Sequence, residues 1–172
     1  MKKSIAALLA AAGLILVPLS LSAQTTANAN AGFQVMSFDI GYAPAWDTNP
    51  PAGGKNFIAP ALFALNVRVA NNFLVGFETL TSGANIDSYL TMKYNFLPML
   101  RGTVAFGQTS NFGAVPGTAE PAMGLGFEAV PFARTIAGSV STEFKLAFQY
   151  LAALNDLRES ALVFALAFGI GF

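Results

Sequence analysis

The chain has 172 residues, of which 54% are hydrophobic and only 10% are charged, and it contains neither histidine nor cysteine. Ordinary soluble domains carry roughly 25% charged residues, so this composition disfavours a surface that faces water. Nine basic residues balance nine acidic ones, which disfavours nucleic-acid binding because that needs a basic face. A metal site without His or Cys needs clustered carboxylates, and the acidic residues are scattered among cations. We therefore expect no metal and no cofactor.

The first 23 residues are typical of a secretory signal peptide. Two lysines precede an apolar run over residues 5–17, and a small-residue cleavage site ends at Ala23. The alternative, an N-terminal membrane anchor, is disfavoured because the apolar run is short. Residues 24–32 are rich in Ala, Asn, Thr and Gln and predict a flexible lead-in. We expect residues 33–172 to form one exported domain.

Beyond residue 32 the dominant period of the sequence is two, as in β-strands. Bulky apolar residues alternate with small or polar ones in eight segments, each close to the roughly ten residues that a tilted membrane strand needs. These segments cover residues 33–42, 57–69, 73–81, 86–96, 99–108, 122–131, 139–152 and 161–172. Because no apolar run after residue 23 reaches about 18 residues, a membrane-spanning helix is not predicted. The pattern predicts an all-β, transmembrane, antiparallel up-and-down barrel of about eight strands.

The predicted connectors differ in length. Residues 43–56 and 109–121 form long loops with Pro and Gly, residues 132–138 form a connector of moderate length, and most of the others are tight turns. If both termini lie in the periplasm, the longer loops fall on the outer side, as in outer-membrane barrels. Pro60 cannot donate a hydrogen bond to a strand neighbour. We place it at the outer rim of the second strand.

The bulky face of each strand is predicted to point outward, toward lipid. A soluble, lipocalin-like barrel would place it inside, but eight strands enclose too little space for so many large side chains. The narrow face carries the charges, which must be paired when buried. We therefore predict a salt-bridge network in the lower or middle lumen. Its members are Asp39, Arg68, Glu78, Lys93, Arg101, Glu128, Glu143 and Lys145, and a ninth charge, Asp87, shares the narrow face.

The last strand carries the most specific motif. Large apolar residues occupy every second position up to the final one, namely Phe164, Leu166, Phe168, Ile170 and Phe172. Together with the signal peptide and the eight alternating strands, this pattern resembles the small outer-membrane barrels of the OmpA/OmpX or OmpW-like type. The resemblance implies a monomer in the bacterial outer membrane, surrounded by lipid. It also implies that the terminal motif is recognised by the barrel-assembly machinery.

Two functions remain open at this point. The first is a structural or surface-interaction role, with the loops around residues 46–56 and 109–121 facing an extracellular partner that the sequence does not identify. The second is a narrow conduit for small hydrophobic molecules, whose upper lumen would be lined by Ile58, Leu62, Leu80, Tyr89, Leu151 and Val163. Interior filling is the simpler interpretation of that lining in an eight-stranded barrel, which is also too narrow for a general porin. Enzymatic activity is not expected, because the barrel enzymes of this membrane use histidine.

Overall fold

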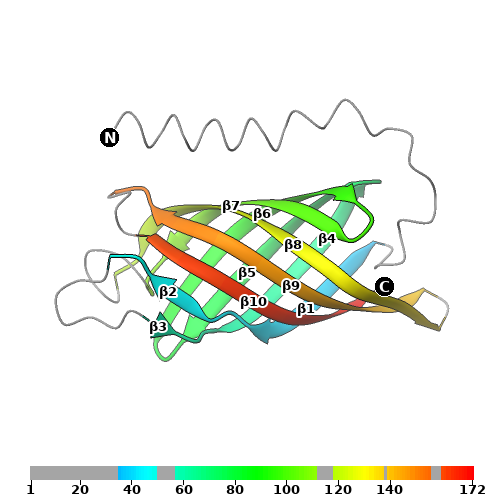
Figure 1. Ribbon diagram of the computed structural model, residues 1–172, viewed down its shortest axis with the longest axis horizontal. Helices are drawn as coiled ribbons and strands as arrows, with labels where there is room; N and C mark the ends of the chain where they lie inside the picture. Colours follow the sequence, from blue (N-terminus) through cyan, green and yellow to red (C-terminus); the bar gives the residue numbers. More distant parts are fainter. Residues whose placement is uncertain (1–34, 50–56, 112–117, 138, 156–159) are drawn as a thin grey trace.

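A computed structural model describes residues 35–49, 57–111, 118–137, 139–155 and 160–172. The predicted signal peptide, the lead-in and the interiors of the longer loops lie outside these residues. The described chain folds into one antiparallel sheet that closes on itself by pairing β1 with β10 (Figure 1). Its strands are β1 (Met36–Tyr42), β2 (Ala45–Asp47), β3 (Phe57–Ile58), β4 (Ala61–Ala70), β5 (Phe73–Ser82), β6 (Asn85–Leu97), β7 (Leu100–Thr109), β8 (Glu120–Ala137), β9 (Val140–Ala153) and β10 (Ser160–Gly171).

The ten strands form a barrel wall of eight, because Pro44 divides one wall strand into β1 and β2 and Pro60 lies between β3 and β4 in another. β2 continues β1 beyond Pro44, since both pair with β10. β3 precedes β4 across Pro60, and the Pro60 carbonyl accepts a 2.9 Å hydrogen bond from the Ala43 amide. Because proline has no N–H to donate, the ladder is interrupted at this residue while the wall continues. The long loop predicted over residues 43–56 is therefore wrong at its start, where β2 is a strand.

The strand that includes Glu128 is longer than predicted. The connector expected over residues 132–138 is wrong, because β8 runs on to Ala137 and pairs with β9 almost to its end. The prediction stopped at Pro131, which cannot donate to a ladder. The structure accommodates this residue in a register shift between Ala129 and Phe132, and bulges are among the places where a strand tolerates proline.

Side chains alternate between the two faces of the wall, as the sequence predicts. Along β10 the five large apolar residues from Phe164 to Phe172 are each 40–50% exposed, whereas Ala165 and Ala167 between them are buried. The outward residues of β1, β4 and β9 follow the same rule. Within the described residues no helix is long and apolar enough to cross a membrane. The outer wall is thus an apolar surface far larger than a soluble monomer exposes.

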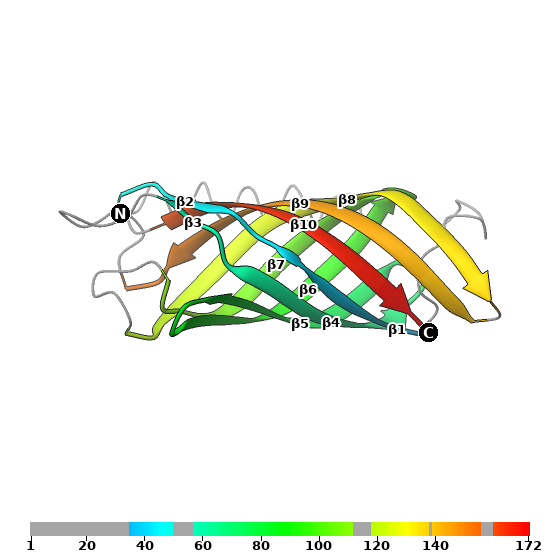
Figure 2. The same ribbon diagram turned by 90° about the horizontal axis from the view of Figure 1, so that it is seen from below.

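Both described termini meet at one end of the barrel, here called the terminal end (Figure 2). The Val35 amide donates a 2.9 Å hydrogen bond to the Phe172 carbonyl there. The connections β4–β5, β6–β7 and β8–β9 turn at this end, and each is short. The longer connections lie at the opposite end, beside the short β5–β6 turn. Gly83 in that turn has φ +62°, a backbone conformation that favours glycine.

Candidate functional site

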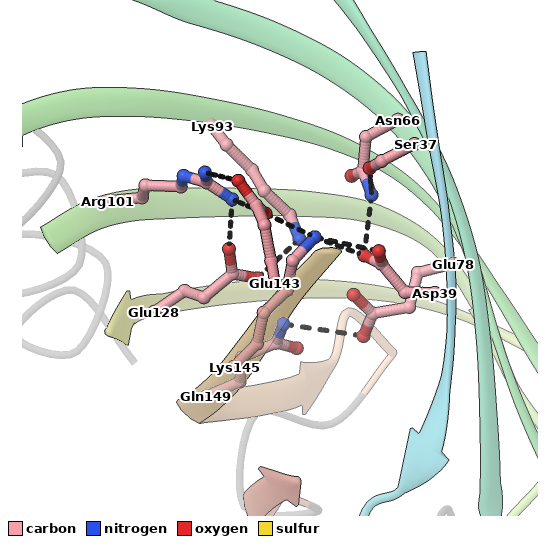
Figure 3. A network of polar contacts seen from close by, with 10 residues as sticks. All are labelled: Ser37, Asp39, Asn66, Glu78, Lys93, Arg101, Glu128, Glu143, Lys145 and Gln149. Atoms are coloured by element: carbon pink, nitrogen blue, oxygen red, sulfur yellow. Dashed lines mark hydrogen bonds and ion pairs between the residues drawn. The ribbon is translucent and has the colours of Figure 1, made fainter. Parts of the chain in front are cut away.

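A cluster of charged side chains lies inside the barrel (Figure 3), toward the terminal end, where Asp39 pairs with Gly169 near the C-terminus. Six strands contribute to it, and every member is at most 6% exposed. We call it the charge cluster, and it consists of Asp39, Glu78, Lys93, Arg101, Glu128, Glu143 and Lys145. These residues fall on the inner face because each stands one position away from an outward apolar residue in its strand.

Glu128 on β8 links two cations. One carboxylate oxygen accepts a 2.8 Å hydrogen bond from Lys93 Nζ, and the other accepts a 2.8 Å bond from Arg101 Nη1. Arg101 in turn donates from Nη2 to Glu143 at 2.9 Å. Hydrogen bonds between ionised partners are about twice as strong as neutral ones. The arrangement therefore ties β6, β7, β8 and β9 together across the interior.

Lys145 carries the network across the seam where the barrel closes. Its Nζ donates to both carboxylate oxygens of Asp39 at 2.7 Å and lies 3.1 Å from Glu143 Oε2. Asp39 also accepts a 2.8 Å bond from Asn66 Nδ2. The bridge from β9 to β1 passes over β10 at Gly169, where an added Cβ would lie 2.4 Å from Asp39 Oδ1. Glycine at this position makes room for the bridge.

Glu78 is the exception within the charge cluster. No cation lies within 4.0 Å of its carboxylate among the described residues, and its hydrogen bond is a long one, 3.4 Å from Gln149 Nε2. It borders a small cavity of about 10 Å³, together with Lys93, Glu128 and Lys145. That space suits about one water molecule and no larger ligand.

The structure places two of the predicted charges at the edges of the network. Arg68 is half-buried near the end of β4, at the terminal end, where it interacts electrostatically with Arg101 and Glu143 of the charge cluster. Asp87 lies toward the opposite end and accepts hydrogen bonds from Thr109 Oγ1 at 3.0 Å and from the amides of Ser110 and Asn111 at 2.6 and 3.0 Å. It thereby holds the chain where β7 leaves the wall. No pattern in the sequence indicated this role.

Sequence reasoning missed the neutral partners of the charge cluster. Asn66 and Gln149 are buried and each donates to a carboxylate of the cluster, and Ser37 lies 3.4 Å from Asn66 Nδ2. Their position on the narrow face was a usable signal, because buried polar side chains require hydrogen-bonding partners. The predicted network contains only ionised residues.

The predicted hydrophobic upper lumen forms a packed core in the other half of the barrel. Tyr89, Leu80 and Leu151 are at most 1% exposed. They pack with Leu62, Val163 and a set of alanines, and Ile58 is half-buried against them. The lining of an open channel would be exposed to water. These side chains cover one another, so interior filling describes them better than a conduit lining.

The chemistry available at the charge cluster is limited. Its carboxylates other than Glu78 are held by cations, and the chain supplies neither His nor Cys as a base or nucleophile. Among the described residues no three metal-binding side chains are placed to share one ion. The geometry serves to neutralise buried charge and to join strands.

A closed eight-stranded antiparallel barrel with an apolar outer wall is the architecture of small outer-membrane-type β-barrels, so the predicted all-β, antiparallel up-and-down barrel is confirmed. Among solved structures the chain is similar to Neisserial surface protein A, with a TM-score of 0.50 and 12% identity over 82% of this chain and 99% of that one. A designed transmembrane β-barrel matches with a TM-score of 0.44 and 10% identity, over 77% of this chain and 94% of that one. No family model and no curated protein sequence matches the chain.

Proposed function

We propose that this protein is an integral barrel of the bacterial outer membrane, with a structural or surface-interaction role and a lumen closed by the charge cluster. The observation that carries this proposal is the inverted polarity of the wall. Large apolar side chains such as Phe38, Phe77 and Phe168 are about half exposed on the outside, whereas Glu143 and Lys145 are at most 2% exposed on the inside. A soluble protein has the reverse arrangement.

Energetics support the membrane assignment. An Arg or Lys on the lipid face at mid-membrane costs about 2–4 kcal/mol, and the outward residues of the membrane-spanning strands are apolar. The backbone groups of a closed barrel are satisfied between neighbouring strands, as lipid requires. In water the same outer surface would favour aggregation.

The closed interior favours a structural or surface role over transport. The charge cluster blocks the terminal half and the packed core blocks the other half, so a passage would require both to rearrange. A conduit for small hydrophobic molecules remains the second candidate, because apolar side chains gather in one half of the lumen. It is less favoured because those side chains are already covered.

The route to the membrane is part of the proposal. Residues 1–23 would direct secretion and be removed, and the motif from Phe164 to Phe172 would be recognised by the assembly machinery. In the barrel these five side chains face outward, where a machine that handles the last strand can reach them. The protein is expected to act as a monomer without a cofactor.

Heat-modifiability after membrane fractionation tests the proposal. The protein should pellet with outer membranes and migrate differently on a gel before and after boiling. Planar-bilayer recordings of the purified barrel should show no sustained conductance. A Lys93→Ser/Glu128→Ser variant, which empties part of the cluster, should also stay closed if it folds, because the packed core still fills the other half of the lumen. Recovery of the folded protein from the soluble periplasmic fraction would refute the membrane role, and a steady conductance of the unaltered protein would refute the closed lumen.

A further inference from the structure

The β8–β9 hairpin extends past the rest of the wall at the terminal end (Figures 1 and 2). The pairing of β7 with β8 stops where Leu100 meets Ala129, yet β8 continues to Ala137 and pairs there with β9 alone. This extension begins at the register shift around Pro131. It gives the barrel a two-stranded projection on the side where both termini lie.

One face of this projection continues the apolar outer wall. Phe132 pairs with Phe144, which faces outward, so Phe132 faces outward as well, and it is 51% exposed. Arg134, two residues on, lies on the same face, and Ile136 near the tip is 64% exposed. The opposite face is lined by smaller residues, such as Thr135 opposite Ser141. An exposed cation thus stands between two exposed apolar side chains.

Arg134 differs from the cations of the charge cluster. Lys93, Arg101 and Lys145 are buried and paired with carboxylates. The guanidinium of Arg134 is exposed and has no carboxylate within 4.0 Å among the described residues. A long cationic side chain beside apolar neighbours suits the boundary between hydrocarbon and lipid headgroups, because its stem packs on apolar groups while its charge stays in the polar layer.

We propose that the outward face of the β8–β9 projection, Phe132 and Arg134, together with the exposed Ile136 at the register shift near its tip, docks on the membrane leaflet at the terminal end, with Arg134 binding the phosphate of anionic lipid headgroups. Guanidinium is the side chain best suited to phosphate geometry, and the face is continuous with the lipid-facing wall. This inference rests on the proposed membrane insertion. It adds a specific lipid contact that fixes the barrel's orientation and depth on one side.

A site-specific fluorescent probe tests this docking, and the absence of cysteine makes single labelling possible. Three single-cysteine variants receive an environment-sensitive dye: Ile136→Cys on the proposed contact face, Thr135→Cys on the opposite face and Leu166→Cys in the outer wall. Each folded barrel is reconstituted in phosphatidylcholine vesicles with or without phosphatidylglycerol. Nitroxide-labelled lipids then report whether the dye touches the membrane.

The expected result is quenching at Leu166→Cys in both vesicles, quenching at Ile136→Cys that is stronger with phosphatidylglycerol, and little quenching at Thr135→Cys. Adding Arg134→Gln should lower the lipid-bound to free ratio at Ile136→Cys about fivefold with phosphatidylglycerol present, since a basic residue near an anionic surface contributes about 1 kcal/mol. Arg134→Lys should retain most of the charge effect. High salt should weaken it.

The possible failures are distinguishable. If the label at Leu166→Cys is quenched while the label at Ile136→Cys is exposed to water, the docking proposal is overturned. The proposed insertion of the barrel then still stands. Water exposure at both positions refutes the insertion itself. A dye at Ile136→Cys that is shielded from water but not quenched by the nitroxide-labelled lipids indicates a protein partner. This outcome overturns the lipid assignment. An unchanged signal in Arg134→Gln overturns the role of Arg134.

Discussion

Two glutamates of the charge cluster separate the effect of ion pairing from the effect of burial. Glu128 accepts 2.8 Å hydrogen bonds from both Lys93 and Arg101, whereas Glu78 has no cation within 4.0 Å among the described residues. Both are at most 4% exposed. The same isosteric change, Glu→Gln, therefore removes a paired charge at one position and an unpaired charge at the other.

We expect Glu128→Gln to lower the free energy of unfolding by about 3–5 kcal/mol, because it leaves two buried cations without their shared partner. This corresponds to a factor of roughly 10² to 10⁴ in the unfolding equilibrium. Glu78→Gln should change the same free energy by about 1 kcal/mol or less and favour the folded state if it changes at all. The neutral amide no longer buries a charge without a partner.

Urea unfolding and refolding in phospholipid vesicles measures both values, with fluorescence of Trp46, the single tryptophan, as the probe. The fraction that shifts on an unboiled gel shows whether each variant folds at all. Equal losses in the two variants would mean that burial of polar volume, and not pairing, governs stability here. A loss in Glu78→Gln alone would reverse the assignment of partners and refute the reasoning.

Three further changes test other parts of the fold. Gly169→Ala should lower the free energy of unfolding by about 1–3 kcal/mol through overpacking, because its Cβ would lie 2.4 Å from Asp39 Oδ1. Urea titration followed by the same gel shift measures this loss. An unchanged urea midpoint would contradict the geometry described for the β9–β1 bridge over Gly169. Leu166→Arg places a cation on the lipid face and should cost about 2–4 kcal/mol in vesicles, and an unchanged urea midpoint would refute the lipid-facing orientation of this residue. Leu151→Ala should cost about 2–5 kcal/mol by leaving a cavity in the packed core, and a neutral outcome in the urea midpoint would instead favour an open conduit.

The architecture of this protein was predictable because a barrel wall is a local pattern. Whether a residue faces lipid or lumen depends on its parity within its strand, and one-dimensional alternation records that directly. Phe164 and its outward neighbours in the last strand illustrate this, as do the inward charges between apolar residues. The limits of β8 were not predictable in the same way, because Pro131 is tolerated only where the register shifts against β9.

The inward position of the charged side chains was predictable, but their grouping into one cluster and their pairing were not. The sequence alone determines that buried charges face inward and nearly balance in sign. It does not determine that Glu128 accepts from two cations, that Glu78 has no ion pair among the described residues, or that Asp87 binds the end of β7 far from the cluster. Those facts depend on strand tilt and stagger, which place residues 35–106 positions apart within 3 Å of one another. Only the closed sheet sets that stagger, because hydrogen bonds between distant strands determine the register all the way round the barrel.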